Sequence, residues 1–407
     1  MMADGSDVLV VGAGIVGAST ARFLAERGVS VTILDAHDPA WGASGRNPGF
    51  VWLHTRAAGT QMELARAGRE LYGSLVEELD DFEFRPSGGM TYFFEEQAEV
   101  FPAFVEARRA AGLPMELLDP SDARDRCPAL PEDIAGSTWN PLDAHIRTGR
   151  LVEALVVDAE RRGAKLERDA RVQRIDVTAG RATGVTTDAG RSYGGSVVVV
   201  ATGAWTPALL EPLGVDLPIS AMRLQVAETE PTDPRFGPVL YGPTAIKQYA
   251  FVRGLPGFDA DRFTHPLERA ADGLAMLELV AQRADGHVLL GCPMDYPGPD
   301  DRATVAGLAL TFGVLGERFP ALAGLAVERT WAGLLPETPD ALPILGLAPW
   351  IEGLALATGH VFGNVAGPIS GKLLAQVLTG ERPDLDLGAF AADRPSLTPT
   401  REAPGRW

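Results

Sequence analysis

The stretch DVLVVGAGIVGAST, residues 7–20, decides the fold of the first part of this chain. Its short run of β-branched residues predicts a buried parallel strand, and Gly12, Gly14 and Gly17 follow in the spacing G-x-G-x-x-G. Because glycine has no side chain, backbone N–H groups and the positive end of the next helix can approach a pyrophosphate. The stretch therefore predicts the phosphate-binding turn of a Rossmann βαβ unit.

The residues after this turn complete the unit. A helix is expected over 14–27, with the polar Ser19, Arg22 and Glu26 on its outer face. The segment VSVTILD predicts the second strand and ends at Asp35, about 20 residues beyond the glycines. A carboxylate there accepts hydrogen bonds from ribose hydroxyls and disfavours a 2′-phosphate. The sequence thus predicts a bound dinucleotide, without choosing between a nicotinamide and a flavin.

Size, charge and cysteine content restrict the class of protein. A chain of 407 residues exceeds one ordinary core, and 46% hydrophobic with 22% charged residues is typical of a soluble globular protein. The formal net charge of −18 disfavours nucleic acid as a partner. Cys127 and Cys292 lie far apart and in no metal-type spacing, so we expect reduced thiols and no metal site.

The chain is expected to be cytoplasmic and to lack a transmembrane segment. Its first residues show neither the basic nor the apolar region of a signal peptide. The apolar run SVVVVATGAW has about half of the roughly 20 residues that span a bilayer.

Helix and strand patterns predict that the chain visits its nucleotide domain three times. An amphipathic helix is expected over 60–80, a further helix and several strands follow residue 148, and a last strand and helix lie near 354–380. The expected fold is α/β, with a discontinuous Rossmann-type nucleotide domain and a second α+β substrate domain on a mixed or antiparallel sheet. The nucleotide domain is placed at 1–81, 145–218 and 328–407, and the substrate domain at 82–144 and 219–327.

The far end of the chain identifies the dinucleotide. ATGAW at 201–205, ATGHVFGNVAGPISG at 357–371, WGASGRNPG at 41–49 and WAGLLPETPDALPILG at 331–346 accompany the N-terminal glycine turn. With these segments the chain resembles the D-amino-acid oxidase-like flavoenzymes, the group of glycine oxidase, monomeric sarcosine oxidase and the D-amino-acid dehydrogenases. The resemblance spans nearly the whole chain and implies FAD. No cysteine lies in the 331 segment or the turn after it, so a non-covalent FAD is expected.

In that family the C-terminal glycine-rich turn meets the flavin ring. Pro368 suits the first turn of a helix, so residues 363–368 are expected to present free N–H groups and a positive dipole end to the ring. Matching the family segments assigns these residues to FAD: Gly12, Ala13, Gly14, Ile15, Val16, Gly17, Asp35, Ala36, Ala43, Ser44, Arg46, Asn47, Gly49, Val172, Thr202, Gly203, Trp205, Gly333, His360, Gly363, Asn364, Val365 and Gly367.

One family feature is missing. The 331 segment follows a family pattern in which an arginine binds the substrate carboxylate, but Leu335 stands at that position. An apolar side chain cannot replace a bidentate guanidinium. Sarcosine-type relatives use an arginine from the segment after SGRN, where this chain has His54 and Arg56. Arg56 is equally compatible with a surface charge, and His54 with a packed core histidine.

Further candidates for positioning the substrate are Tyr249 and Trp331. Tyr249 is also compatible with a core position on a strand, and Arg223 and Arg253 are rival cations.

The resemblance implies oxidation of an amine, an amino acid or a related primary or secondary amine. A hydride passes from the substrate carbon to flavin N5, and the resulting imine hydrolyses. Two alternatives stay open: oxidation of a 2-hydroxy acid, and a flavin-binding electron-transfer or assembly subunit without its own substrate. The electron acceptor is oxygen or another molecule, and a homo- or hetero-oligomer is compatible with the sequence.

Some relatives carry a lysine near the ring that favours oxygen. This chain has only Lys165, Lys247 and Lys372, none in the GHVLLGCPMD strand, which leans towards a dehydrogenase.

Overall fold

The computed structural model describes residues 6–233 and 235–398, and within them the chain forms two eight-stranded sheets and one two-stranded sheet. The first large sheet consists of β1 (Ser6–Val11), β2 (Val31–Leu34), β8 (Lys165–Glu167), β9 (Val172–Thr178), β10 (Arg181–Thr187), β11 (Ser192–Val200), β17 (Ile344–Leu347) and β18 (Leu354–Thr358).

This first sheet has the order β17-β18-β11-β1-β2-β8, with β10 and β9 continuing from β11. Strands β18, β11, β1, β2 and β8 are parallel, whereas β17, β10 and β9 pair antiparallel with their neighbours. Consecutive parallel strands joined by helices form the expected Rossmann-type sheet, assembled from the beginning, the middle and the end of the chain.

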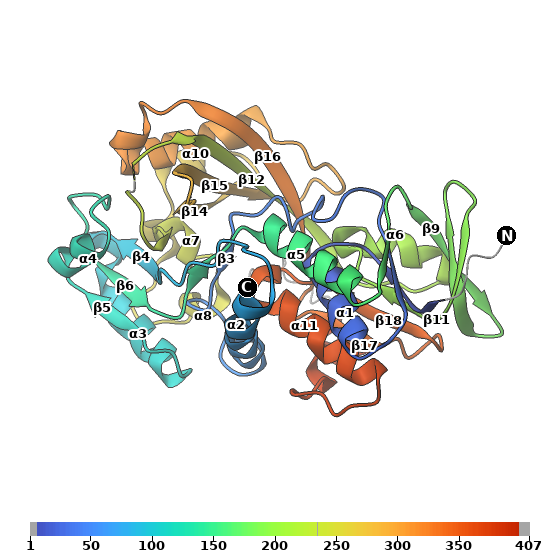
Figure 1. Ribbon diagram of the computed structural model, residues 1–407. Coiled ribbons are helices and arrows are strands. Elements are labelled where there is room, and N and C mark those ends of the chain that lie inside the picture. Colours follow the sequence, from blue (N-terminus) through green and yellow to red (C-terminus); the bar gives the residue numbers. More distant parts are fainter. Residues whose placement is uncertain (1–5, 234, 399–407) are drawn as a thin grey trace.

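The second large sheet consists of β4 (Gly89–Phe93), β5 (Glu116–Leu118), β6 (Gly136–Asn140), β12 (Ser220–Pro231), β13 (Val239–Tyr241), β14 (Ala275–Gln282), β15 (His287–Asp295) and β16 (Val327–Glu337). Its order is β16-β12-β15-β14-β13-β4-β6-β5, and the β13–β4 pair is parallel while the other pairs are antiparallel. Of the two expected types, mixed or antiparallel, the sheet is mixed. In Figure 1, β12, β15 and β16 lie at the upper left, and β9 and β11 at the right.

One proposed domain boundary falls inside a strand. The division at residue 328 assigns most of β16 to the nucleotide domain, but β16 pairs with β12 in the second sheet. The chain returns to the first sheet only with β17.

The helices form two groups. Along the first sheet and between the sheets are α1 (Ile15–Glu26), α2 (Thr60–Glu78), α5 (Thr148–Arg161), α6 (Thr206–Leu210) and α11 (Gly363–Leu378), and α11 lies beside α1 in Figure 1. Near the second sheet are α3 (Phe101–Ala110), α4 (Pro120–Arg126), α7 (Pro243–Ile246), α8 (Ala250–Arg253), α9 (Pro266–Ala270) and α10 (Val305–Arg318).

Helix α1 has no broad outer face, contrary to the sequence-based expectation. Ser19 and Arg22 are buried. Arg22 Nε donates to Asp158 of α5 at 3.0 Å, and its terminal nitrogen pairs with Glu78 of α2. A Cβ added at Gly371 of α11 would lie 2.5 Å from the Ser19 Cβ. Helices α5 and α11 therefore cover the side of α1 that was expected to face water.

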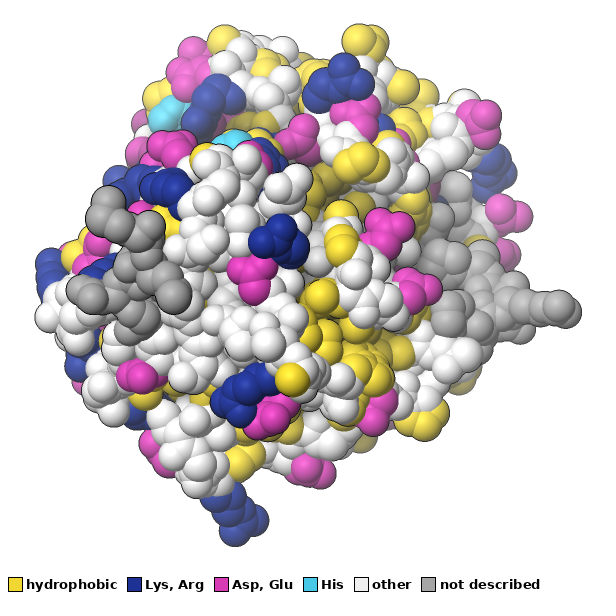
Figure 2. Space-filling view, turned by 90° about the vertical axis from the view of Figure 1, so that its right-hand side faces the viewer, with side chains coloured by type: hydrophobic (Ala, Val, Ile, Leu, Met, Phe, Trp, Pro, Cys, Tyr) yellow, Lys and Arg dark blue, Asp and Glu magenta, His cyan; other side chains and the backbone are white. Residues whose placement is uncertain are grey.

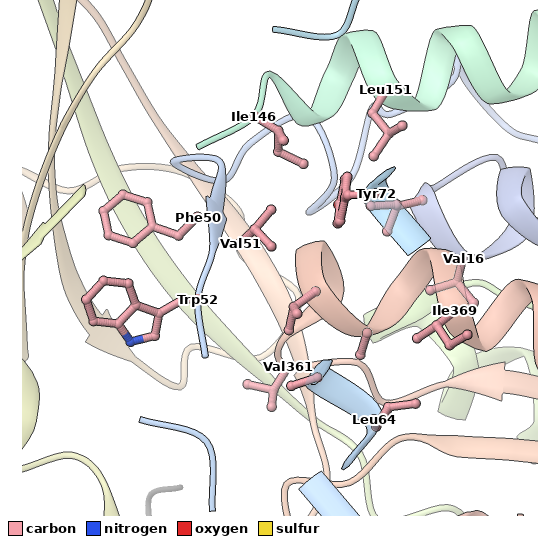
Figure 3. Packing of buried hydrophobic residues seen from close by; sticks show 14 of the residues in the cluster. Val16, Phe50, Val51, Trp52, Leu64, Tyr72, Ile146, Leu151, Val361 and Ile369 are labelled. Atoms are coloured by element: carbon pink, nitrogen blue, oxygen red, sulfur yellow. The ribbon is translucent and has the colours of Figure 1, made fainter. Parts of the chain in front are cut away.

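A short pairing connects the two parts of the molecule. Strand β3 (Phe50–Val51) pairs antiparallel with β7 (Ala144–His145). Figure 3 shows Phe50 and Trp52 on one side of this segment and Val51 on the other, towards Ile146 and Tyr72. This alternation is the two-residue period of an extended chain, and it turns both large rings away from the helical core.

Two surface properties bear on partners. No helix within the described residues is long and apolar enough to cross a membrane. On the face drawn in Figure 2, acidic and basic side chains are interspersed.

Candidate active site

A cavity of about 540 Å³ is lined by residues of both large sheets. Val11, Leu34 and Ala357 line it at or near the carboxyl ends of β1, β2 and β18. This is the edge at which open α/β sheets bind their ligands, and the volume lies within the range of roughly 300–1,000 Å³ of small-molecule and cofactor sites.

The glycine turn brings backbone close to backbone at the nucleotide end. Gly12 has φ of +108°, and a Cβ there would lie 2.5 Å from the Ala201 carbonyl oxygen that follows β11. At Gly17 a Cβ would collide with the Gly12 carbonyl, so α1 could not begin this close to the turn. Gly14 lines the cavity, where the first N–H groups of α1 have no partner within their own helix.

Asp35 lies beside this turn and is fixed by two backbone donors. Its Oδ2 accepts from the Ala13 N–H at 2.6 Å, and its Oδ1 accepts from the His37 N–H at 2.9 Å. Burial raises the pKa of the Asp35 carboxyl, and both of these hydrogen bonds oppose that shift. The side chain lines the cavity with acceptor capacity left for a sugar hydroxyl.

Asn47 joins three segments that border the cavity. Its Nδ2 donates to the carbonyl of Ser44 at 2.8 Å, and its Oδ1 accepts from the Gly49 N–H at 2.8 Å. The same oxygen accepts from Nδ2 of Asn364, at the start of α11, at 2.8 Å, and from Oγ1 of Thr148, at the start of α5, at 3.0 Å. Asn47 therefore sets the position of the SGRN segment relative to both helix starts.

The last helix begins earlier than the sequence suggested. Pro368 is the sixth residue of α11 and lies inside the helix, not in its first turn. A proline there cannot donate to the carbonyl of Asn364, four residues earlier. The Tyr72 hydroxyl of α2 donates to that carbonyl at 2.5 Å instead. The N–H groups without intrahelical partners thus belong to Gly363 and Asn364, which line the cavity, whereas the Val365 N–H donates to the Phe362 carbonyl at 3.2 Å.

Most residues that the resemblance assigns to FAD meet around this cavity. The following line it: Gly12, Gly14, Ile15, Val16, Asp35, Ala36, Ala43, Ser44, Asn47, Val172, Thr202, Gly203, Trp205, His360, Gly363, Asn364 and Val365. Six are not among its lining residues: Ala13, Gly17, Arg46, Gly49, Gly333 and Gly367.

Residues of this set that do not line the cavity pack behind its wall. A Cβ at Gly367 would lie 2.9 Å from a methyl carbon of Ile15, so this glycine lets α11 approach α1. A Cβ at Gly333 would lie 3.1 Å from Cβ of Arg46. The Arg46 guanidinium stacks on Trp41 at 4.4 Å and pairs with Asp301, so an acidic partner already balances its charge.

The donor set fits the FAD that the resemblance implies. Asp35 could accept from a ribose hydroxyl, the starts of α1 and α11 could present N–H groups to the phosphates and the ring, and the lining includes residues from β2 as well as from the second sheet. His360 lies on the same lining, and neither of its ring nitrogens has a hydrogen-bond partner among the described residues. Burial lowers the His360 pKa to about 3, so its ring is neutral at neutral pH.

Arg56 supplies a buried cation at the other end of the cavity. Its side chain is almost fully buried, and its guanidinium lies 3.2 Å from the centroid of the Phe362 ring. One terminal nitrogen donates to Thr55 at 3.0 Å and to the Tyr249 hydroxyl at 3.4 Å. Nε and the other terminal nitrogen have no hydrogen-bond partner within the described residues. Burial lowers the pKa of Arg56, and two of its nitrogens are buried without a protein partner among the described residues.

The other substrate-positioning candidates have different places. Tyr249 lines the cavity next to Arg56. His54 does not; it is buried behind Trp52, with ring centroids 4.5 Å apart, and its Nδ1 and Nε2 meet Asp143 at 3.0 Å and Thr138 at 2.7 Å. Burial lowers the His54 pKa although Asp143 opposes the shift. This is the core position that the sequence left open for His54.

Trp331 is also off the lining. Its Nε1 donates to the Arg46 carbonyl at 2.8 Å, so it ties β16 to the SGRN segment. The rival cations are occupied elsewhere: Arg223 forms a two-point pair with Asp295, and Arg253 Nε donates to the Lys247 carbonyl.

Sequence reasoning missed most of the wall around Arg56. That wall includes Phe50, Trp52, Tyr241, Leu277 and Leu279. The available signal was the alternation in AMLELVAQ, which predicts Leu277 and Leu279 on one face of a strand. It could not tell which ligand that face meets.

Comparisons with known proteins show which chains this one is similar to. The chain is 29% identical over 394 residues to the bifunctional protein ThiO/ThiG of Synechocystis sp., covering 96% of this chain but only 54% of that protein, so it spans about half of that relative's length. It is 27% identical over 398 residues to the glycine oxidase of Pseudomonas aeruginosa, covering 94% of this chain and 98% of the relative.

Among solved structures, the fold is similar to that of glycine oxidase from Geobacillus kaustophilus. The TM-score is 0.83 at 23% identity, over 96% of this chain and 99% of the other. The sequence profile of the DAO family, FAD dependent oxidoreductase, matches residues 7–377. This chain therefore belongs to the DAO family of FAD-dependent oxidoreductases.

Proposed function

We propose that this protein oxidises the C–N bond of an amino acid or a closely related amine, with FAD as the hydride acceptor. The observation that carries the proposal is Arg56, a buried guanidinium among the cavity-lining residues; its Nε and one terminal nitrogen have no partner within the described residues and become available to a ligand once the side chain turns towards the cavity. A planar two-oxygen anion satisfies such a fork, and the carboxylate of an amino acid is that kind of group.

The residues of the chain hold and orient the reactants. Asp35 and the glycine turn would hold the ribose and the pyrophosphate, while the first turn of α11 would face the flavin ring. When bound, FAD supplies a two-electron acceptor that takes a hydride from the carbon next to the substrate nitrogen. The positive end of the α11 helix dipole would stabilise the negative charge that the flavin ring gains on reduction.

Arg56 would fix the substrate by its carboxylate, so that the carbon beside the nitrogen stays close to the ring. Loss of the hydride from the unprotonated amine leaves an iminium ion, which releases a proton to water to give the imine. Water then hydrolyses the imine to a carbonyl compound and an amine or ammonia. No side-chain base is needed for the hydride step if the substrate amine is unprotonated.

Three finer points belong to this proposal. None of the three lysines is among the residues that line the cavity, which favours an acceptor other than oxygen. Neither Cys127 nor Cys292 lines it, so FAD should be held without a covalent bond and remain in the supernatant after acid precipitation. Both thiols are free and buried, and we propose a cytoplasmic location for the protein.

The test is an anaerobic titration of the purified holoenzyme, followed by the visible absorbance of the flavin. The panel contains D- and L-amino acids, N-methyl amino acids, cyclic imino acids, carboxylate-free amines and 2-hydroxy acids. We expect at least one amino acid to bleach the flavin and its carboxylate-free analogue to fail. Bleaching by hydroxy acids alone, or only in the presence of a second protein, would contradict the proposal. Peroxide release compared with dye reduction then identifies the acceptor.

A further inference from the structure

Apolar side chains from four strands of the second sheet line the cavity. Strand β14 shows how one face of a strand meets it. Leu277 and Leu279 point into the cavity, while Glu278 between them points to the other side and bonds to Tyr92 and Thr244. The strand residues on the lining are Leu224, Tyr241, Leu277, Leu279, Leu334, Leu335 and Pro336.

Aromatic rings continue this wall towards Arg56. Phe50 and Tyr241 have ring centroids 5.5 Å apart, Trp52 and Tyr241 4.4 Å, and Tyr241 and Tyr249 6.5 Å. Figure 3 shows Phe50 and Trp52 projecting to the same side of their segment. The Trp52 Nε1 is engaged with Thr55 at 2.9 Å, so the wall offers mainly ring carbon to a ligand.

Charge is confined to one point at this end. Among the described lining residues the other charged side chains are Asp35, Arg171 and Asp188, all near the ends of β2, β9 and β10 at the nucleotide end. Burial raises the pKa of Tyr241 well above its usual value, so its hydroxyl stays neutral. A ligand bound here thus meets one cation and otherwise an apolar and aromatic surface.

We infer that the substrate is an amino acid with an uncharged, apolar side chain. This inference rests on the proposed function. With the carboxylate on Arg56, the side chain meets the leucine and aromatic wall. A charged side chain would lose its water without gaining a partner, and glycine would leave the wall in contact with water. One methylene in such a pocket changes the specificity of an enzyme by roughly 10- to 200-fold.

The first experiment measures the anaerobic rate constant of flavin reduction divided by the substrate Kd, for both enantiomers where they exist. The panel is leucine, phenylalanine, alanine, glycine, glutamate and lysine. In the preferred enantiomer, leucine or phenylalanine should exceed glycine, glutamate and lysine by at least about 100-fold. Equal or faster reduction by glycine, glutamate or lysine overturns the inference and leaves the proposed function standing. If no amine reduces the flavin, the proposed function itself fails.

The second experiment uses ligands that cannot react. Acetate, 3-methylbutanoate, phenylacetate and succinate are added to the holoenzyme, and binding is read from the change in the flavin spectrum and from Tm. The two apolar acids should bind at least about tenfold more tightly than acetate or succinate. Equal affinity for all four overturns the inference, whatever the enzyme oxidises.

A matched pair of variants links the preference to the wall. Leu335 is half-buried on β16, so its replacement should spare the fold. Leu335→Ala should lower the preference for leucine over alanine by about tenfold, whereas Leu335→Met should keep it. If the folded Leu335→Ala holoenzyme keeps the same preference for leucine over alanine, the apolar wall takes no part in substrate binding, and the inference is overturned. If Leu335→Ala does not fold, the panel of amino acids and the series of unreactive acids described above still test the inference.

Discussion

Replacing Arg56 by methionine separates the role of its charge from the role of its packing. Methionine keeps an unbranched apolar stem of similar reach and removes every donor. In the free protein two of the guanidinium nitrogens lack partners among the described residues, while the remaining one donates to Thr55 and Tyr249. The side chain therefore contributes little net stability until an anion arrives.

The expected size of both effects follows from these contacts. Two buried donors without partners cost about 2–6 kcal/mol together. The favourable contacts contribute a comparable stabilisation: about 0.5–2 kcal/mol from stacking on Phe362 and about 3–6 kcal/mol from the two hydrogen bonds. Arg56→Met should thus shift Tm by less than about 3 °C. Loss of the buried carboxylate pair should cost about 2–5 kcal/mol, or roughly 30- to 5,000-fold in the reduction rate constant divided by Kd.

The assay compares an amino acid with its carboxylate-free amine in anaerobic stopped-flow reduction of the flavin. Arg56→Met should lose activity with the acid and not with the amine, and Arg56→Lys should recover only part of the loss because an ammonium lacks the fork. Arg253→Met is the matched control, since Arg253 is not among the lining residues. Equal losses with both substrates, or a fall in Tm of more than about 5 °C, would refute this role for Arg56.

Three further predictions concern the support of the cavity. Tyr72→Phe should lower the free energy of unfolding in urea by about 1–3 kcal/mol, because it leaves the Asn364 carbonyl without its hydrogen-bond donor. Adding Pro368→Ala should recover much of this loss, because alanine supplies a helix N–H to the same carbonyl. Additive effects of the two substitutions would contradict this explanation. Asn47→Asp replaces the amide group that donates to two backbone carbonyls by a carboxylate oxygen that cannot donate. The Kd for FAD, measured by reconstitution of the apoprotein, should therefore rise by at least about tenfold. An unchanged Kd would exclude a role for Asn47 in holding the SGRN segment in place. His360 has a folded-state pKa of about 3, below its usual 6.5, so the unfolded chain binds the proton first as pH falls. Stability should therefore decrease from about pH 6.5 towards 3, by up to about 1.4 kcal/mol per pH unit for this ring, and His360→Gln should flatten the slope measured by urea unfolding between pH 7 and 5.

The nucleotide end of the site could be predicted because its information is local. Gly12, Gly14 and Gly17 are adjacent in sequence, and Asp35 follows one helix and one strand later. The spacing of a βαβ unit fixes where such residues meet in space. Pro368 was misplaced by one turn because the preference of proline for a first turn is a tendency that tertiary contacts override, here through the Tyr72 hydroxyl.

The substrate end could be predicted only in part, because strand pairing brings its residues together. Trp52, Tyr241, Leu279 and Leu334 come from four separate segments, and no local pattern gives their register. A one-residue slip of β14 would place Glu278 in the cavity in place of its leucine neighbours. The boundary at residue 328 failed for a related reason, since the sequence of β16 does not say which sheet it joins.

The segment that bears Arg56 also explains how an apolar Leu335 is tolerated on β16. The Leu53 N–H donates to Asp143 at 2.6 Å, the Arg56 N–H donates to the Leu53 carbonyl at 2.9 Å, and Arg108 donates to the Arg56 carbonyl. This turn is therefore held by buried hydrogen bonds before any ligand binds. A guanidinium on such a turn loses little conformational freedom when it meets a carboxylate, whereas a long cation on an exposed loop would lose more. On the proposed role of Arg56, this single arginine supplies the charge pair and leaves β16 free to contribute an apolar surface.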